Sequence, residues 1–125
     1  MSFPGKYFTI EKAQEEDIII FRISGEFDVY TAVELKIPLH EAISEKHKKI
    51  IVDMTEVSFV DSSGLGLLIH ALKHLRAYNG QIVLVVKRKD IIDIIRVTNL
   101  SQLLRIYPTI EEAAKGFLDT QKTSI

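Results

Sequence analysis

Three runs rich in isoleucine and valine, at residues 17–27, 49–55 and 81–87, limit the folds that this chain can adopt. Each run has the length and the β-branched composition of a buried strand. The stretches that separate them, 31–46 and 61–78, space their apolar residues as helices do, and in the second stretch these residues form one buried face. Strands joined through helices predict an α/β fold with a mixed, mostly parallel β-sheet.

The N-terminal half is expected to add a hairpin and one irregular helix. Residues 7–12 alternate apolar and polar side chains, which predicts a strand paired with 17–27 through a Glu-Glu or Glu-Asp turn. We expect the second strand to end at Gly25. Pro38 lies inside the stretch 31–46, and a proline removes an amide donor and clashes with the preceding turn. This predicts either a kink or a short helix followed by another that starts near Pro38. The apolar positions of this stretch are Val33, Leu35, Ile37, Leu39, Ala42 and Ile43.

The region after the third buried strand predicts one short helix and one short strand. We expect Asp90 to cap this helix, since aspartate is a favoured N-cap residue. Asn99 is expected to end it, because asparagine tolerates the left-handed backbone conformation. Residues 103–107 are expected to form the last strand.

A final helix is expected from the capping box of Thr109 and Glu112 to about Leu118. All 125 residues then belong to a single domain with about four helices. The 16 basic and 17 acidic residues nearly cancel, so there is no basic field for nucleic acid and no polybasic membrane patch. The absence of cysteine excludes thiol chemistry, and no signal peptide or membrane span is recognisable, so we expect a cytoplasmic protein.

Two polar loops are expected at the same edge of the predicted sheet. A right-handed crossover through a helix makes the strands before these loops parallel, so their carboxyl ends coincide. One loop is G-E-F-D at 25–28, and the other is V-D-S-S-G at 60–64. Open α/β sheets bind their ligands at this edge. Asp28 and Ser62 are therefore expected to be near neighbours.

Ser62 and Ser63 open a predicted helix, where a serine can have several roles. The simplest is capping, by a serine hydroxyl or by Asp61. A phosphate would be tolerated there, because the start of a helix favours anions. Gly64 and Gly66 keep the first turn free of large side chains, either for close packing on a strand or for access by a macromolecular partner.

Catalysis and metal binding find little support in the sequence. A nucleophile elbow needs glycine two residues before its serine, where Val60 stands before Ser62. His70 and His74 lie two and three turns further along the helix and point away from the loop, so no general base is available. Their i, i+4 spacing could bind zinc, but the H-E-x-x-H motif and an evident third ligand are missing. G-L-G is neither a Walker A loop nor a Rossmann fingerprint. We therefore expect no enzyme activity, cofactor or metal.

Phosphorylation of a serine in this loop would provide a regulatory role without catalysis. A phosphate on Ser62 adds about −1.5 to −2 charges beside Asp61 and the expected position of Asp28. On a surface that binds a partner, this charge would repel acidic groups and add a desolvation cost. A loss of about two or three kcal/mol would weaken binding roughly a hundredfold.

Three segments of the chain together resemble one known family. They are G-E-F-D-V-Y-T-A from Gly25, I-I-V-D-M-T-E-V-S-F-V-D-S-S-G-L-G from Ile50, and N-G-Q-I-V-L-V from Asn79. They closely resemble the STAS domain of bacterial anti-sigma factor antagonists. The resemblance extends from about Ile18 to Leu118, and D-S-S-G-L-G is its most specific motif.

The resemblance implies a partner-switching protein that is not an enzyme. Its unphosphorylated form would bind an anti-sigma factor that is also a serine kinase, and would thereby release a sigma factor. The kinase, which binds the ATP, would phosphorylate Ser62, and a phosphoserine phosphatase would reset the switch. The alternative within the family is a scaffold-type subunit of a stress-signalling assembly. We expect a monomer or weak dimer.

The resemblance also implies which residues surround the phosphoacceptor. Asp28 matches the acidic residue beside it, and Ser63 is the neighbouring serine that is not usually phosphorylated. The preference for Ser62 over Ser63 comes from the resemblance alone, since both open the same helix. The other residues expected near the phosphoacceptor or the partner are Asp61, Gly64, Leu65 and Gly66.

Overall fold

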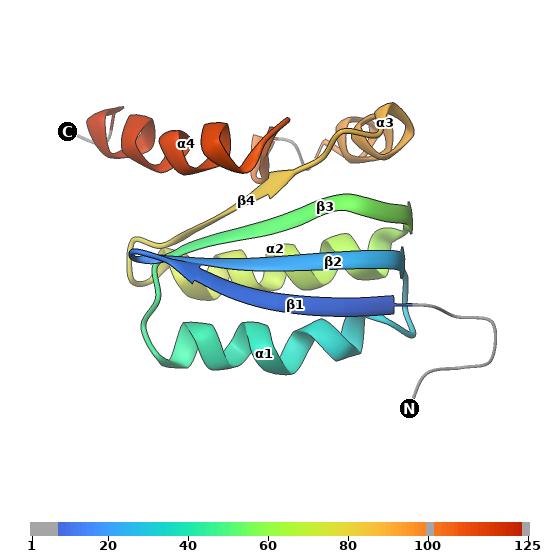
Figure 1. Ribbon diagram of the computed structural model, residues 1–125, viewed down its shortest axis with the longest axis horizontal. Helices are drawn as coiled ribbons and strands as arrows, with labels where there is room; N and C mark the ends of the chain where they lie inside the picture. The colour runs from blue at the N-terminus through green and yellow to red at the C-terminus, as the bar shows by residue number, and fades with distance from the viewer. Residues whose placement is uncertain (1–7, 100–101, 124–125) are drawn as a thin grey trace.

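The structure, a computed structural model, describes residues 8–99 and 102–123 (Figure 1). These residues form five strands and four helices, in close agreement with the predicted order of elements. In chain order they are β1 (Phe8–Glu15), β2 (Ile18–Phe27), α1 (Ala32–Ser44), β3 (Lys49–Val60), α2 (Ser62–Arg76), β4 (Gln81–Val85), α3 (Lys89–Val97), β5 (Arg105–Tyr107) and α4 (Ile110–Thr123).

The strands form one mixed sheet in the order β1-β2-β3-β4-β5. β1 pairs with β2 in antiparallel fashion, whereas β2, β3, β4 and β5 pair in parallel. This confirms the predicted α/β fold with a mostly parallel sheet. None of the described helices is long and apolar enough to cross a membrane.

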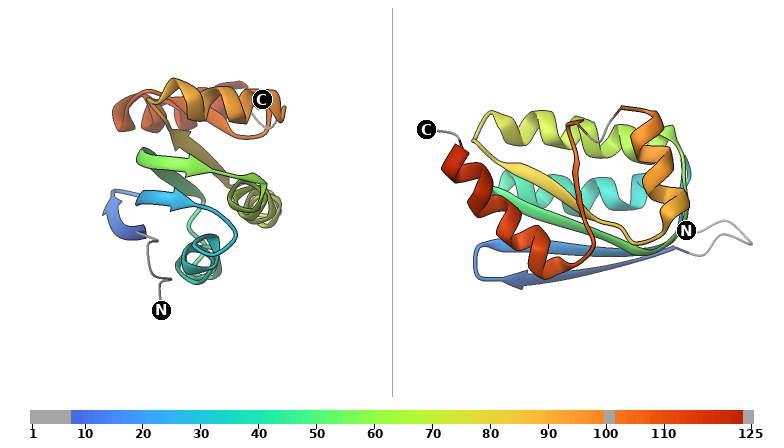
Figure 2. Two further views of the ribbon diagram at one scale, coloured as in Figure 1. Left: turned by 90° about the vertical axis from the view of Figure 1, so that its right-hand side faces the viewer. Right: turned by 90° about the horizontal axis from the view of Figure 1, so that it is seen from above.

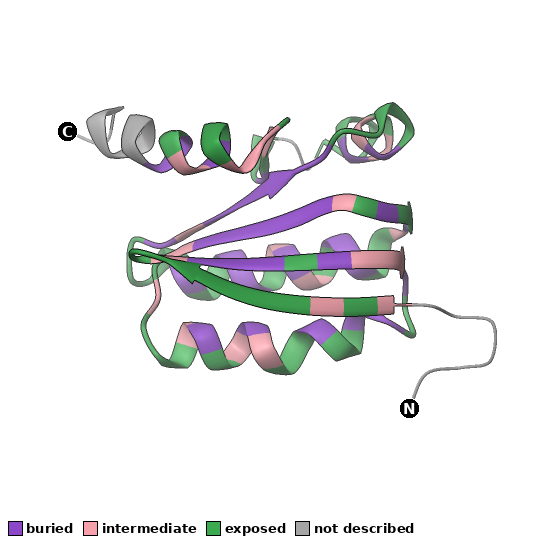
Figure 3. Ribbon diagram, viewed as in Figure 1, coloured by how far each residue is buried: buried purple, intermediate pink, exposed green. Residues whose placement is uncertain are grey.

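Two apolar cores lie on opposite faces of the sheet. The larger core contains α1 and α2, which lie side by side in Figure 2, together with the buried residues of α3. The smaller core lies under α4 and contains Ile20, Ile51, Val83, Val85, Ala113 and Phe117. Figure 3 shows that burial is concentrated in β2, β3 and β4, whereas the edge strand β1 is mostly exposed.

β2 and β3 both extend further than the sequence predicted. The prediction that the second strand ends at Gly25 is wrong, because β2 continues to Phe27. The register with β3 shifts just after Gly25, whose φ of 101° is left-handed, so the glycine permits a bulge instead of ending the strand. β3 continues to Val60, well beyond the predicted end at residue 55. The connections at this edge are therefore only residues 28–31 and the single residue 61.

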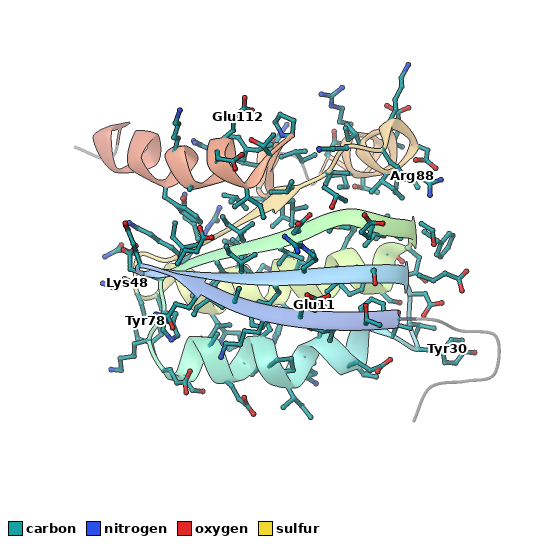
Figure 4. All side chains as sticks on the ribbon, in the orientation of Figure 1. Glu11, Tyr30, Lys48, Tyr78, Arg88 and Glu112 are labelled. Carbon is teal, nitrogen blue, oxygen red and sulfur yellow. The ribbon has the colours of Figure 1, made fainter. Side chains whose placement is uncertain are left out.

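The ends of α3 and α4 test the predicted caps. Asp90 does not occupy the N-cap position of α3, which belongs to Arg88; the two side chains instead form hydrogen bonds of 2.9 and 2.7 Å. Asn99 follows α3 with a φ of 61°, as predicted for a left-handed stop. The Oγ1 atom of Thr109 accepts a hydrogen bond from the amide of Glu112 at 3.1 Å, which confirms the cap of α4 (Glu112 is labelled in Figure 4).

The β1–β2 hairpin turns through Glu16 and Asp17, the second of the two predicted dipeptides. Glu16 adopts a left-handed φ of 55°. The ammonium group of Lys49, at the start of β3, lies 3.0 Å from the carboxylate of Asp17. A hydrogen bond from Lys49 lowers the pKa of Asp17, so this exposed carboxylate stays ionised to a lower pH than it would alone. The pair joins the hairpin turn to the central strand.

α1 is a single helix that includes Pro38, so the alternative of two successive helices is wrong. Leu35 and Leu39, on either side of the proline, are both fully buried against the sheet. Burial of two leucines contributes about 3–6 kcal/mol, which offsets a cost of about 3 kcal/mol for a proline in a helix interior. Tertiary packing therefore overrides the local preference for a break.

Replacing Pro38 with alanine should stabilise the fold. An alanine restores an amide donor to the carbonyl of Glu34 and removes the ring from the preceding turn, so the free energy of unfolding should rise by about 1–3 kcal/mol. Urea denaturation of both proteins measures this difference. A lower stability for Pro38→Ala would mean that packing of the half-buried ring contributes more than the missing hydrogen bond.

Candidate functional site

The two polar loops meet where the parallel strands β2 and β3 end, at the right-hand side of Figure 1. Phe27 and Val60 are partners at the ends of these strands. The amide of Asp61 donates a hydrogen bond to the carbonyl oxygen of Phe27 at 3.3 Å. Asp28 follows Phe27, and Ser62 follows Asp61, so the proximity predicted from connectivity is confirmed.

Asp61 alone connects β3 to α2 and serves as the N-cap of that helix. Its backbone is extended, and its Oδ1 atom accepts hydrogen bonds from the amides of Ser63 at 2.9 Å and Gly64 at 3.2 Å. Aspartate is among the best N-cap residues because its carboxylate satisfies otherwise unpaired amides and interacts well with the helix dipole. The cap is therefore the aspartate, and two amides at this helix start already bind an anionic group.

Ser62 and Ser63 are the first two residues of α2, and both are exposed. Because Asp61 supplies the cap, the fold does not require either hydroxyl for that purpose. Both hydroxyls are accessible to a modifying enzyme, so exposure does not distinguish between the two serines.

Asp28 and Thr31 hold the loop between β2 and α1. Asp28 is 4% exposed, and its Oδ1 atom accepts hydrogen bonds from the amides of Tyr30 at 3.0 Å and Thr31 at 3.1 Å. The hydroxyl of Thr31 in turn accepts a hydrogen bond from the amide of Asp28 at 2.9 Å and donates one to the carbonyl of Glu26. Asp28 thus fixes the backbone beside Ser62. Thr31 was not among the residues predicted for this site, although the D-x-x-T spacing is compatible with such a turn.

Gly64 and Gly66 meet different surroundings, although the sequence offered the same two explanations for both. A Cβ atom on Gly64 would lie 2.6 Å from the Phe27 ring and 2.8 Å from the Phe27 carbonyl oxygen. At Gly66 a Cβ would have no atom within 4 Å. Gly64 therefore permits close packing of α2 on the end of β2, whereas Gly66 leaves the surface bare.

An exposed apolar patch lies on the loop after β2 and on the outer side of α1. It consists of Val29, Tyr30, Val33 and Ile37, which are 53%, 53%, 59% and 67% exposed. Figure 4 shows Tyr30 at the same edge of the molecule as the ends of β2 and β3. Val33 and Ile37 are two of the apolar positions of the predicted helix, but they face outward. Residues two positions apart point to different sides of a helix, and the core takes Leu35 and Leu39.

Leu65 and the two histidines of α2, which the sequence also singled out, do not share the surface around Ser62. Leu65 is fully buried and belongs to the larger core, so it anchors the first turn of α2. His70 and His74 lie about 12 and 18 Å from Ser62 along the helix axis, because each residue of an α-helix advances the chain by about 1.5 Å. This distance leaves Ser62 without a general base on its own helix. Among the residues that the structure describes, no three His, Asp or Glu side chains are placed to hold a metal ion together.

Comparison with known proteins identifies one family and several relatives. The family model described as STAS domain matches residues 9–113. A protein of Listeria monocytogenes named anti-sigma-B factor antagonist is 33% identical over 95 residues, which cover 76% of this chain and 83% of that protein. A protein of Thermotoga neapolitana, named as a putative anti-sigma factor antagonist homolog, is 28% identical over 99 residues, which cover 78% and 88%.

Solved structures share the fold at low sequence identity. An anti-sigma factor antagonist from Mycobacterium paratuberculosis superposes with a TM-score of 0.81 at 23% identity, over 88% of this chain and 93% of that one. The phosphorylated form of the Bacillus cell fate determinant SpoIIAA superposes with a TM-score of 0.66 at 24% identity, over 89% and 99%.

Alanine at the two glycines of α2 should have opposite effects on stability. Gly64→Ala should lower the free energy of unfolding by about 1–3 kcal/mol, since the new methyl group overlaps Phe27. Gly66→Ala should raise it by about 0.5–1 kcal/mol, because alanine has the higher helix propensity and meets nothing. Chemical denaturation of the two variants measures both values. Equal effects would contradict the distinction between a packing glycine and an open one.

Proposed function

The chain belongs to the STAS domain family, and from this we propose that it is a cytoplasmic anti-sigma factor antagonist that phosphorylation of Ser62 inactivates. Unphosphorylated, it binds an anti-sigma factor with serine kinase activity and thereby frees a sigma factor. That kinase binds ATP and modifies Ser62, and a phosphatase restores the binding-competent form. The observation that carries the proposal is an exposed serine pair, fixed by Asp61 and next to the loop that Asp28 holds.

The relatives support this proposal through what their descriptions state. The Listeria protein is named an anti-sigma-B factor antagonist, and the Mycobacterium structure is described as an anti-sigma factor antagonist. SpoIIAA has been solved in a phosphorylated form and in an unphosphorylated form. A phosphorylation switch on this chain agrees with both descriptions.

The geometry at the start of α2 explains how a phosphate would act. The carboxylate of Asp61 already accepts hydrogen bonds from the amides of Ser63 and Gly64, so a phosphate on Ser62 would compete with it for them. The added charge of about −1.5 to −2 would instead stay exposed beside an existing carboxylate. A partner that covers this edge would have to desolvate both anionic groups, which is costly unless it supplies matching cations. Phosphorylation therefore acts on the interface more than on the fold.

The surface beside Ser62 is suited to binding a protein. The apolar patch of Val29, Tyr30, Val33 and Ile37 offers apolar area that a partner can bury, and tyrosine is frequent among residues that dominate binding energy. Gly66 leaves the adjacent turn of α2 bare, so a partner can approach the backbone closely. We place the kinase-binding surface across this patch and the first two turns of α2.

Phosphate transfer to Ser62 tests the central proposal. Incubated with its cognate anti-sigma factor kinase and Mg-ATP, the chain should gain one phosphate, which peptide mass spectrometry should locate on Ser62. Ser63→Ala should still be modified, and Ser62→Ala should not. Ser62→Asp should bind the kinase roughly 10–100-fold more weakly than Ser62→Ala, because it adds a charge where the hydroxyl stood. Modification of Ser63 would contradict the assignment, and equal affinities would contradict switching by charge.

Two tyrosines provide a matched test of the binding surface. Tyr30 and Tyr78 are 53% and 47% exposed and lie at opposite ends of the sheet (Figure 4). Tyr30→Ala should weaken binding of the kinase about tenfold or more, as truncation of a central aromatic residue commonly does. Tyr78→Ala should leave the affinity unchanged. Titration calorimetry of both variants measures the difference, and equal losses would place the interface elsewhere.

A further inference from the structure

Three of the four histidines of the chain meet between α1 and α2, away from the serine pair. His70 and His74 lie one turn apart on the exposed side of α2, and their Nε2 atoms are 3.2 Å apart. The centroids of their rings are 4.8 Å apart. His40 of α1 faces this pair, with its ring centroid 6.4 Å from that of His70 and 6.0 Å from that of His74.

The ring of His40 contains a nitrogen atom that the fold leaves unsatisfied. Among the buried side-chain nitrogen and oxygen atoms of the described residues, only Nε2 of His40 has no hydrogen-bond partner. A buried polar atom without a partner costs about 1–3 kcal/mol, so its retention calls for an explanation. The rings of His70 and His74 lie nearby, with centroids 6.4 and 6.0 Å from that of His40, so a ligand shared by the three rings would give this nitrogen a partner.

The separation of the two paired nitrogens matches that of two ligands of one metal ion. Two imidazole nitrogens, each about 2.0–2.1 Å from a tetrahedral zinc ion, lie about 3.3 Å apart, and their ring centroids lie roughly 5 Å apart. The His70–His74 pair has corresponding values of 3.2 and 4.8 Å. His40 stands about 1 Å too far from both for the same arrangement. Rotation of its side chain can close a gap of this size, because rotamers of partly exposed residues interconvert readily.

We propose that His70 and His74 bind a divalent transition-metal ion of the zinc class, with His40 as the third ligand and water in the fourth position. No three ligands are placed to hold the ion as the side chains stand, so binding draws His40 toward the pair. Each ring offers Nε2 to the metal when its proton resides on Nδ1. A neutral ring that carries its proton on Nε2 must first transfer that proton to its own Nδ1, by exchange with solvent, before its Nε2 atom can bind the metal.

The chemistry of the three ligands selects the class of ion. Imidazole suits zinc, copper, nickel and iron, whereas magnesium and calcium prefer oxygen ligands. This cluster matches no sequence motif, because the third ligand lies 30 residues before His70 and on another helix. Packing of α1 on α2 places His40 beside the pair.

A metal ion at this place would link the two helices that begin at the functional edge. α1 follows the loop held by Asp28, and α2 follows Asp61 and opens with the serine pair. Binding of an ion to the folded chain alone shifts the unfolding equilibrium toward the native state. The site does not depend on phosphorylation of Ser62, so the two proposals can fail independently.

Titration calorimetry with Zn²⁺ tests the proposal on the full chain without a polyhistidine tag, in a buffer that does not bind metals. We expect saturable binding of one ion per chain and no binding of Mg²⁺. His70→Gln and His74→Gln should each weaken Zn²⁺ binding about tenfold or more, and His40→Gln should weaken it less but measurably. His47→Gln is the matched control and should change nothing, because His47 lies in the α1–β3 connection beside Glu45.

Two further measurements exclude trivial explanations. The Co²⁺ complex should show the visible absorption of a four-coordinate ion, and His70→Gln should abolish it. Zn²⁺ should raise the thermal unfolding midpoint of the native chain and should not raise that of the His70→Gln, His74→Gln double variant. Because both residues are exposed, glutamine at these positions leaves the fold intact. Absent binding, binding unaffected by the double variant, or binding unaffected by His40→Gln would overturn the proposal.

Discussion

Parallel pairing of β2 with β3 is the constraint on which the candidate functional site depends. The pairing continues to Phe27 and Val60, so the segments that follow the two strands leave the sheet at the same place. The hydrogen bond from the amide of Asp61 to the carbonyl of Phe27 extends this pairing into the loops. Gly64 then permits α2 to pack on Phe27 with no side chain between them. Without this register, the serine pair and the Asp28 loop would have no fixed relation.

Structural and exposed roles are divided between neighbouring residues at this edge. Asp28 and Asp61 use their carboxylates to bind backbone amides, which fixes the shape of each loop. Ser62, Ser63 and Gly66 are exposed in the first two turns of α2, and a Cβ atom on Gly66 would meet no other atom within 4 Å. A chemical change at an exposed serine therefore alters charge at the surface while the supporting contacts persist. Such a division lets one site be both rigid and modifiable.

Local sequence patterns predicted the strands, the order of elements and the meeting of the two loops, because all three follow from periodicity and chain connectivity. They failed where tertiary contacts decide. Gly25 permits a bulge within a strand that its sequence suggested would end there. Pro38 stays inside a helix because burial of its neighbours outweighs the local cost. The position of His40 beside His70 could not be predicted, because no local spacing relates residues on two different helices.

The cap formed by Asp61 also determines what a phosphate at Ser62 can do. Had the amides of Ser63 and Gly64 been unoccupied, a phosphate could have bound them and stabilised the start of α2. They already bind a carboxylate, so an added phosphate gains little from the helix and leaves more negative charge at the surface. A change of this kind is felt mainly by a molecule that must cover the site. Under the proposed phosphorylation of Ser62, the aspartate before the serine pair would thus favour a switch in binding over a switch in folding.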